Sequence, residues 1–320
     1  MSPNGYIPRP RAQEYIPSRR REDTIDLLQW IPAASLGFAF VTTMAVLAAW
    51  RYRSTRAARR HALTQALLRA PGESLRSRMA DANWDAAEYA ALALFVLPLA
   101  AALLAPYWNA TGEIPVQEPA FAVAGCALAL QGWLSWRLWS VLRRARRLAL
   151  AYEAEVAAGQ ELDRLAPLGY RVFHDVPAAE RGFNVDHVVV GPAGVFAVET
   201  EGRATRNNNG GESEVSYDGE TLRFPGWRET KPLKQAVARA DWVRAWLSTA
   251  VGEAVPVQPL VVLPGWQVRR TAISGIPVLA ARRIGHFFGR MEREPKMSEA
   301  LIQELAQQLE RRCRNPAPAH

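Results

Sequence analysis

Two long runs without a charged side chain constrain this chain more than any other feature of its sequence. Residues 30–50 and 89–108 contain no Asp, Glu, Lys or Arg. A helix formed by either run would extend about 30 Å, which is the thickness of the hydrocarbon core of a bilayer. We therefore predict a transmembrane helix from each run. We predict a third from residues 119–139, in which Arg137 can reach the membrane interface beside several tryptophans.

Two of these runs, residues 30–50 and 119–139, have an alternative interpretation. A signal peptide would be shorter than the first run and would end in small residues, whereas this run ends in Trp50-Arg51-Tyr52-Arg53, a membrane-interface pattern. A re-entrant or interfacial segment stays an alternative for residues 30–50. A buried core helix is the alternative for residues 119–139, but the sequence around them offers no amphipathic partner helices.

The distribution of arginine predicts how the chain is oriented in the lipid bilayer. Residues 51–88 and 143–147 are rich in arginine, whereas the short loop 109–118 contains only acidic charges. Because Lys and Arg are retained on the cytoplasmic side, we predict a multi-pass protein of the inner (plasma) membrane, with everything after residue 142 in the cytoplasm. The Pro- and Arg-rich residues 1–29 are predicted to be a disordered tail, which three spans would place outside.

After residue 142 the pattern becomes that of a soluble α/β domain, which we place at 143–313 with a short tail at 314–320. Helical and β-rich segments alternate there in an order typical of layered α/β domains. The predicted strands are 170–176, 183–190, 195–199 and 257–263, and Asp218-Gly219 marks a hairpin between 215–217 and 222–224. The predicted helices are one through 148–162, one that starts after Thr230, one at 283–291 and one at 298–312.

The net charge and the number of cysteines exclude only a few kinds of ligand and site. The net charge of +8 suits anionic lipid and nucleic-acid phosphate equally well. The chain has 2 cysteines, too few for a disulfide framework and without the spacing of a zinc site. Within the soluble domain we identify a candidate phosphate-binding set, namely Arg203, Lys231, Lys234 and Arg239.

Strand alternation brings carboxylates together in this domain. Side chains alternate along a strand, so Glu199 and Glu201 share one face. The tight turn at 191–194 would fold the preceding strand back antiparallel, which would set Asp186 beside Glu199. Neighbouring carboxylates repel each other unless a cation or a proton intervenes, and an all-oxygen set is what Mg²⁺ or Mn²⁺ accepts.

At these positions the sequence resembles the nuclease-related domain, one of the restriction-endonuclease-like folds with a D…ExK signature. The matching segments are Gly159–Leu162, Asn184–Pro192, Gly194–Thr200 and Gln235. The resemblance covers about residues 150–265 and implies an α+β domain with a central mixed sheet. It also implies that Asp186 and Glu199 hold Mg²⁺ or Mn²⁺ and that the wider catalytic set contains Glu161, Glu201 and Gln235.

One departure from the family pattern leaves the activity open. Where the signature has lysine two residues after the glutamate, this chain has Glu201, which cannot supply the same positive charge to a phosphate. Arg203, Lys231 and Lys234 are candidates for a migrated cation. The leading prediction is a membrane-anchored, metal-dependent nuclease that hydrolyses phosphodiester bonds, with DNA favoured as substrate.

Two alternatives to a nuclease remain. The first is a catalytically degenerate module that binds nucleic acid or a protein partner at the membrane. The second is a structural subunit of a membrane complex or homo-oligomer, which would have no salt-dependent affinity for DNA.

Overall fold

The structure is a computed structural model of the chain, and it describes residues 30–57, 67–111, 118–178, 181–204, 213–291 and 297–314. The predicted tail 1–29 and residues 315–320 of the C-terminal tail lie outside the described residues. The chain divides into two compact units. One contains Met1–Thr43 and Leu94–Gln131, and the other contains Met44–Ala93 and Gly132–His320.

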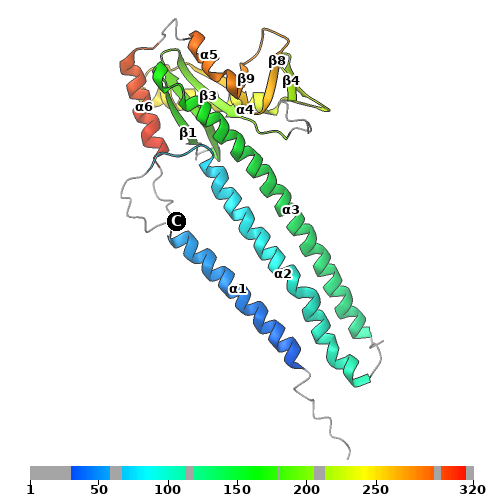
Figure 1. The fold of residues 1–320 in the computed structure, drawn as a ribbon. Coiled ribbons are helices and arrows are strands. Elements are labelled where there is room, and N and C mark those ends of the chain that lie inside the picture. The colour runs from blue at the N-terminus through cyan, green and yellow to red at the C-terminus, as the bar shows by residue number, and fades with distance from the viewer. Residues whose placement is uncertain are drawn as a thin grey trace, which may run out of the picture. The chain divides into compact units, whose positions relative to one another are not determined.

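The apolar runs form long helices, α1 (Ile31–Ala57), α2 (Glu73–Thr111) and α3 (Glu118–Asp163) (Figure 1). Two helical stretches, Ile31–Tyr52 and Glu73–Ala105, are long and apolar enough to cross a membrane. Their apolar side chains are largely uncovered, since Phe38 and Leu94 each expose 71% of their surface. Such helices are poorly suited to be the core of a soluble domain.

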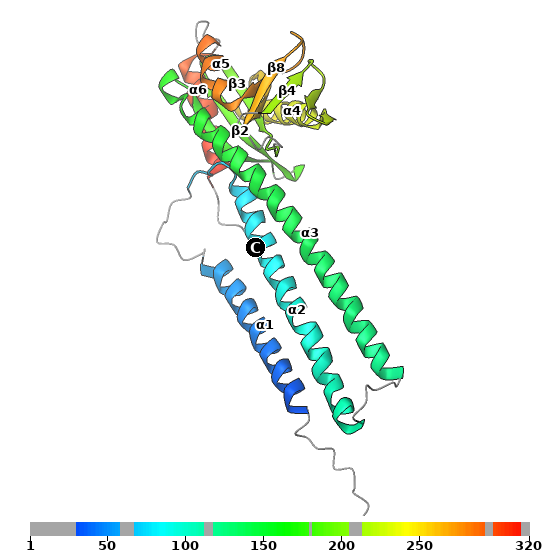
Figure 2. The same ribbon diagram turned by 45° about the vertical axis from the view of Figure 1, so that its right-hand side comes forward.

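The third predicted span has a different outcome. Residues 119–139 form the first part of α3. In the described part of the chain, the helical stretches that are long and apolar enough to cross a membrane are the two in α1 and α2, and this one is not among them. Gln131 and Arg137 interrupt its apolar run. The helix then continues without a break past residue 142, where the sequence pattern had changed to that of a soluble domain (Figure 2).

An aromatic cluster with an arginine joins α2 to the first half of α3 inside the larger unit. The rings of Tyr89 and Trp133 meet edge to face with centroids 6.3 Å apart. Arg137 Nη2 donates a hydrogen bond of 3.0 Å to the Tyr89 hydroxyl, and its guanidinium lies 5.8 Å from the Trp133 ring. Tyr, Trp and Arg together are typical of the boundary between hydrocarbon and water.

Two sheets form the rest of the larger unit. The first has the order β1 (Arg171–Ala178), β2 (Phe183–Gly191), β3 (Gly194–Thr200), β7 (Val257–Leu263) and β9 (Val278–Ala280). The second has the order β6 (Trp227–Glu229), β5 (Leu222–Phe224), β4 (Ser213–Tyr217) and β8 (Trp266–Arg270). In the first sheet β1, β2 and β3 pair antiparallel while β3, β7 and β9 pair parallel, so the predicted mixed sheet and α+β class are confirmed.

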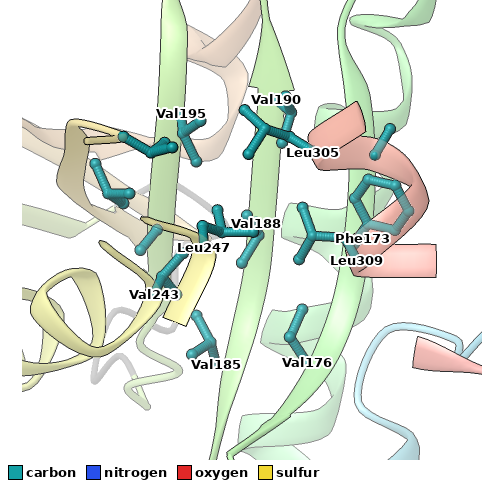
Figure 3. Packing of buried hydrophobic residues seen from close by; sticks show 14 of the residues in the cluster. Phe173, Val176, Val185, Val188, Val190, Val195, Val243, Leu247, Leu305 and Leu309 are labelled. Carbon is teal, nitrogen blue, oxygen red and sulfur yellow. The ribbon is translucent and has the colours of Figure 1, made fainter. Parts of the chain in front are cut away.

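Helices cover both faces of the first sheet. On one face Val188, Val190 and Val195 pack against α4 (Lys231–Val251), through Val243 and Leu247, and against α6 (Glu299–Cys313) (Figure 3). On the other face Phe196 and Val198 pack against the end of α3 and against α5 (Ile284–Met291). Short 3₁₀ turns at Ala166–Leu168 and Ala281–Arg283 lead into β1 and α5. Alternate residues of β3 therefore belong to different cores, as its sequence pattern predicts.

The predicted elements of this domain are found with small shifts at their ends. The four predicted strands correspond to β1, β2, β3 and β7, and the predicted hairpin is the pair β4 and β5. Strands β6, β8 and β9 were missed. β6 and β9 have three residues each and β8 has five, so their sequences are too short to show a clear strand period, and pairing with neighbouring strands makes them extended.

Asp175 in β1 fastens the start of α2 to the first sheet. Its carboxylate accepts hydrogen bonds from the Ser74 backbone N–H at 2.9 Å and from the Ser74 hydroxyl at 2.8 Å, and it forms an ion pair with Arg69. The residue is 1% exposed and has a positive φ of 48°, a conformation that Asp tolerates better than most residues. A buried carboxylate thus satisfies one of the first backbone N–H groups of the long apolar helix.

Candidate functional site

Asp186 and Glu199 lie opposite each other on adjacent antiparallel strands. The register pairs His187 of β2 with Val198 of β3, and one further step sets Asp186 against Glu199. Both side chains contact Arg239 of α4, and they are 7% and 3% exposed. The turn at 191–194 folds the strands back as predicted, so two carboxylates meet in a site that excludes most water.

A single arginine of α4 binds both carboxylates. Arg239 Nη1 lies 3.1 Å from Asp186 Oδ1 and also forms an ion pair with Glu199 Oε2. The other oxygen of Asp186, Oδ2, accepts a hydrogen bond of 2.7 Å from the Thr200 backbone N–H. Burial raises the pKa of Asp186, while the charge of Arg239 and the Thr200 hydrogen bond act in the opposite direction. Arg239 was predicted to contact phosphate, and the structure places it inside the acidic site.

A third carboxyl group, which sequence reasoning missed, approaches from α3. Glu155 is 8% exposed, and burial together with the negative charges of Asp186 and Asp175 raises its pKa to about 9. The group is therefore neutral at pH 7, which avoids a third negative charge beside Asp186. A signal was present in the sequence, because Glu155 shares the helical spacing of the buried residues Ala158, Leu162 and Leu165.

Glu201, at the position of the family lysine, belongs to a separate ion-pair cluster. Arg203 contacts its carboxylate and also binds Glu229 of β6 through two hydrogen bonds, of 2.7 and 3.1 Å. Burial raises the pKa of Glu201 to about 7, against the charge of Arg203. Arg203 is therefore already bound by two carboxylates, and the cation found at Asp186 and Glu199 is Arg239 instead.

The backbone between these two clusters passes very close to α3. A Cβ atom added at Gly202 would lie 2.6 Å from the Leu150 carbonyl oxygen and 2.9 Å from Ala154 Cβ. Only glycine fits there without moving the helix. This close contact sets the stretch of α3 that carries Glu155 against the end of β3.

The part of the chain that contains this site was compared with models of protein families. Residues 150–264 match the model of the nuclease-related domain. The chain carries a nuclease-related domain. Comparisons with curated proteins and with solved structures gave no match. The matched segment runs from the end of α3 through β7, so it contains Glu155, Asp186, Glu199 and Arg239.

Asp186 and Glu199 are called the acid pair below. The remaining predicted site residues of the nuclease-related domain lie apart from this pair or at its edge. The Glu161 carboxylate is held by Arg164, and no hydrogen bond or ion pair in the described ranges links it to Asp186 or Glu199. Gln235 is partly buried on α4, one helical turn before Arg239. Lys231 and Lys234 are exposed in the first turn of α4.

The fit of a divalent metal ion to this site is partial. Two opposed carboxylates supply the oxygen ligands that Mg²⁺ or Mn²⁺ prefers. However, a guanidinium already pairs with both of them, and no group of three His, Cys, Asp or Glu side chains in the described part of the chain is arranged to hold a metal. The pair could therefore accept a metal ion only if Arg239 moved away.

The raised pKa of Glu155 predicts a pH-dependent stability difference between the wild type and Glu155→Gln. Unfolded, the Glu155 carboxyl ionises near its usual pKa of 4.5, but folded it keeps its proton until about pH 9. Stability that the wild type has below pH 4.5 is therefore lost as the pH rises, by at most about 1.4 kcal/mol per pH unit. Glu155→Gln mimics the protonated form, so it should become increasingly more stable than the wild type between pH 4.5 and 9.

Thermal unfolding of the full chain in detergent across this pH range measures the difference. Glu161→Gln on the same helix is the matched control. A stability difference between the wild type and Glu155→Gln that does not change with pH would contradict the prediction.

Proposed function

We propose that this protein is a membrane-anchored nuclease that hydrolyses phosphodiester bonds of nucleic acid, with DNA as the favoured substrate. The observation that supports it is the placement of Asp186 and Glu199, buried and opposite each other on β2 and β3, with Arg239 between them. The match to the nuclease-related domain over residues 150–264 supports the same class of activity.

In this proposal some residues of the site bind the metal ion and others set the charge that the substrate meets. In the proposed active form Asp186 and Glu199 would hold Mg²⁺ or Mn²⁺, which supplies an activated water and stabilises the charge that builds on phosphate. Neutral Glu155 keeps the negative charge of the site low enough for an anionic substrate to approach. Arg239 can bind phosphate oxygens, since its guanidinium keeps its charge at any working pH.

The start of α4 is the proposed contact with the nucleic-acid backbone. Lys231 and Lys234 are exposed there, and the N-terminal end of a helix favours phosphate. Arg203 is a weaker contact than the sequence suggested, because Glu201 and Glu229 already neutralise it. Binding of this kind should weaken as salt is added.

The nuclease proposal predicts that Glu199→Ala abolishes cleavage by the full chain in detergent. Loss of one of the two opposed carboxylates should lower the rate by on the order of a thousandfold or more. The assay compares DNA and RNA substrates with Mg²⁺, Mn²⁺ and a chelator. Glu214→Ala, at an exposed glutamate paired with Arg269, is the control. Absence of cleavage of either nucleic acid with either metal would overturn the proposal.

A second candidate function is a nuclease-fold module that binds nucleic acid without cleaving it. It is favoured by Glu201, which stands where the signature has lysine and is held by Arg203. This candidate predicts that the wild type binds DNA in a salt-dependent manner but cleaves only after Glu201→Lys, because lysine restores a positive charge beside the acid pair. Cleavage by the wild type that Glu201→Lys does not improve would exclude it.

The proposed anchor is the pair of apolar helices together with residues 119–139, which must also cross the bilayer for the nuclease-related domain to lie in the cytoplasm with residues 51–88. Three features support it: the length and apolarity of Ile31–Tyr52 and Glu73–Ala105, the arginine-rich segments that flank them, and the cluster of Tyr89, Trp133 and Arg137. Residues 119–139 would complete a multi-pass arrangement.

We expect the full chain to stay in the membrane fraction after alkaline extraction. A reporter fused to the C-terminus should be active in the cytoplasm, and the domain should be protected from protease added outside intact cells. Release by alkali would contradict the anchor, and digestion from outside would contradict the orientation.

A further inference from the structure

We infer that Arg239 is the resident counter-ion of Asp186 and Glu199, and that a divalent metal ion and Arg239 compete for the same two carboxylates. The inference rests on the proposed function for the choice of Asp186 and Glu199 as metal ligands. It goes beyond that function because it makes metal binding depend on where one arginine side chain lies.

The electrostatics of the acid pair require a positive charge at this place. Two carboxylates that face each other with 7% and 3% of their residue surfaces exposed cannot both be ionised without a counter-charge. The Arg239 guanidinium contacts both of them, and its own side chain is 17% exposed. A single group thus fills the role that a bound cation would otherwise have.

No other cation in the described ranges contacts either Asp186 or Glu199 through an ion pair. Arg203 is bound by Glu201 and Glu229, and Lys234 is exposed on the outer side of α4. The backbone of Arg239 is held in place by its helix, so only the side chain can move off the carboxylates. The buried stripe of α4 includes Ala236, Ala240 and Val243, so the helix cannot rotate to remove Arg239 without uncovering its apolar face.

Competition for the carboxylates leads to two arrangements of the site. With Arg239 on Asp186 and Glu199, one of the two negative charges is compensated and the site takes up metal poorly. With the guanidinium on another anion, the two carboxylates are free to bind a divalent ion. A nucleic-acid phosphate is an anion that a guanidinium binds well, so substrate would promote metal binding by removing Arg239 from the acid pair.

The test measures Mn²⁺ binding and thermal unfolding of the full chain in detergent, without nucleic acid. Arg239→Met removes the charge while keeping an unbranched side chain. We expect this variant to unfold at a lower temperature than the wild type in chelator, because two buried carboxylates lose their counter-ion. Added Mn²⁺ should restore its unfolding temperature, and it should bind Mn²⁺ on the order of a hundredfold more tightly than the wild type.

Arg244→Met is the matched control, since Arg244 is on the same helix and is paired with the exposed Asp241. Its unfolding temperature should respond to Mn²⁺ as that of the wild type does. Equal Mn²⁺ affinity of the wild type and Arg239→Met would overturn the inference. So would a loss of stability in Arg239→Met that Mn²⁺ does not relieve.

A second variant covers the case in which Arg239→Met does not fold without metal. Adding Glu199→Gln to Arg239→Met removes one of the two charges while keeping the shape of the side chain. This double variant should fold in chelator and should not gain stability from Mn²⁺. Failure of the double variant to fold would mean that Arg239 is needed for packing and not as a counter-ion, which overturns the inference.

Cleavage plays no part in these measurements, so the two proposals fail separately. Tighter Mn²⁺ binding by Arg239→Met in a protein that cleaves no nucleic acid would support the counter-ion and reject the nuclease. Cleavage by the wild type with unchanged Mn²⁺ binding in Arg239→Met would do the reverse.

Discussion

The ion pairs from Arg239 to Asp186 and Glu199 join α4 to the two central antiparallel strands of the first sheet, and the other polar groups of the site are arranged around them. The pairs allow two carboxylates to be buried where a charge alone would be costly. Glu155, the third carboxyl group nearby, keeps its proton because burial and the negative charges of Asp186 and Asp175 outweigh the opposing charge of Arg239. Arg239 thus compensates part of the negative charge of the acid pair.

The first sheet is joined to the long helices at two further places. Asp175 of β1 caps the first turn of α2, and Gly202 lets the chain after β3 pass close to the backbone of α3. Both contacts are buried or sterically tight, so neither helix can shift much without disturbing β1 or β3. The start of α2, the end of α3 and the first sheet are therefore joined through short, tight contacts.

Glu201 shows how a family signature can be altered without loss of the fold. The position of the lysine is taken by a carboxylate, and Arg203 and Glu229 form a cluster around it that satisfies its charge. A positive charge reaches the acid pair from α4 instead, on Arg239. Arginine stabilises phosphate charge but accepts no proton, so Arg239 can replace the charge of the family lysine but not its capacity to accept a proton.

The sequence by itself determined the apolar helices, the four long strands, the α4 helix and the opposition of Asp186 and Glu199, because each depends on local periodicity or on a short turn. It could not determine the partners of the charged groups. Arg239 is far along the chain from both carboxylates, Glu155 enters from a helix that precedes the sheet, and Arg203 turns to Glu229. The short strands β6, β8 and β9 also exist only through their neighbours. Such pairings depend on how α3 and α4 pack on the sheet, and only the tertiary structure decides that.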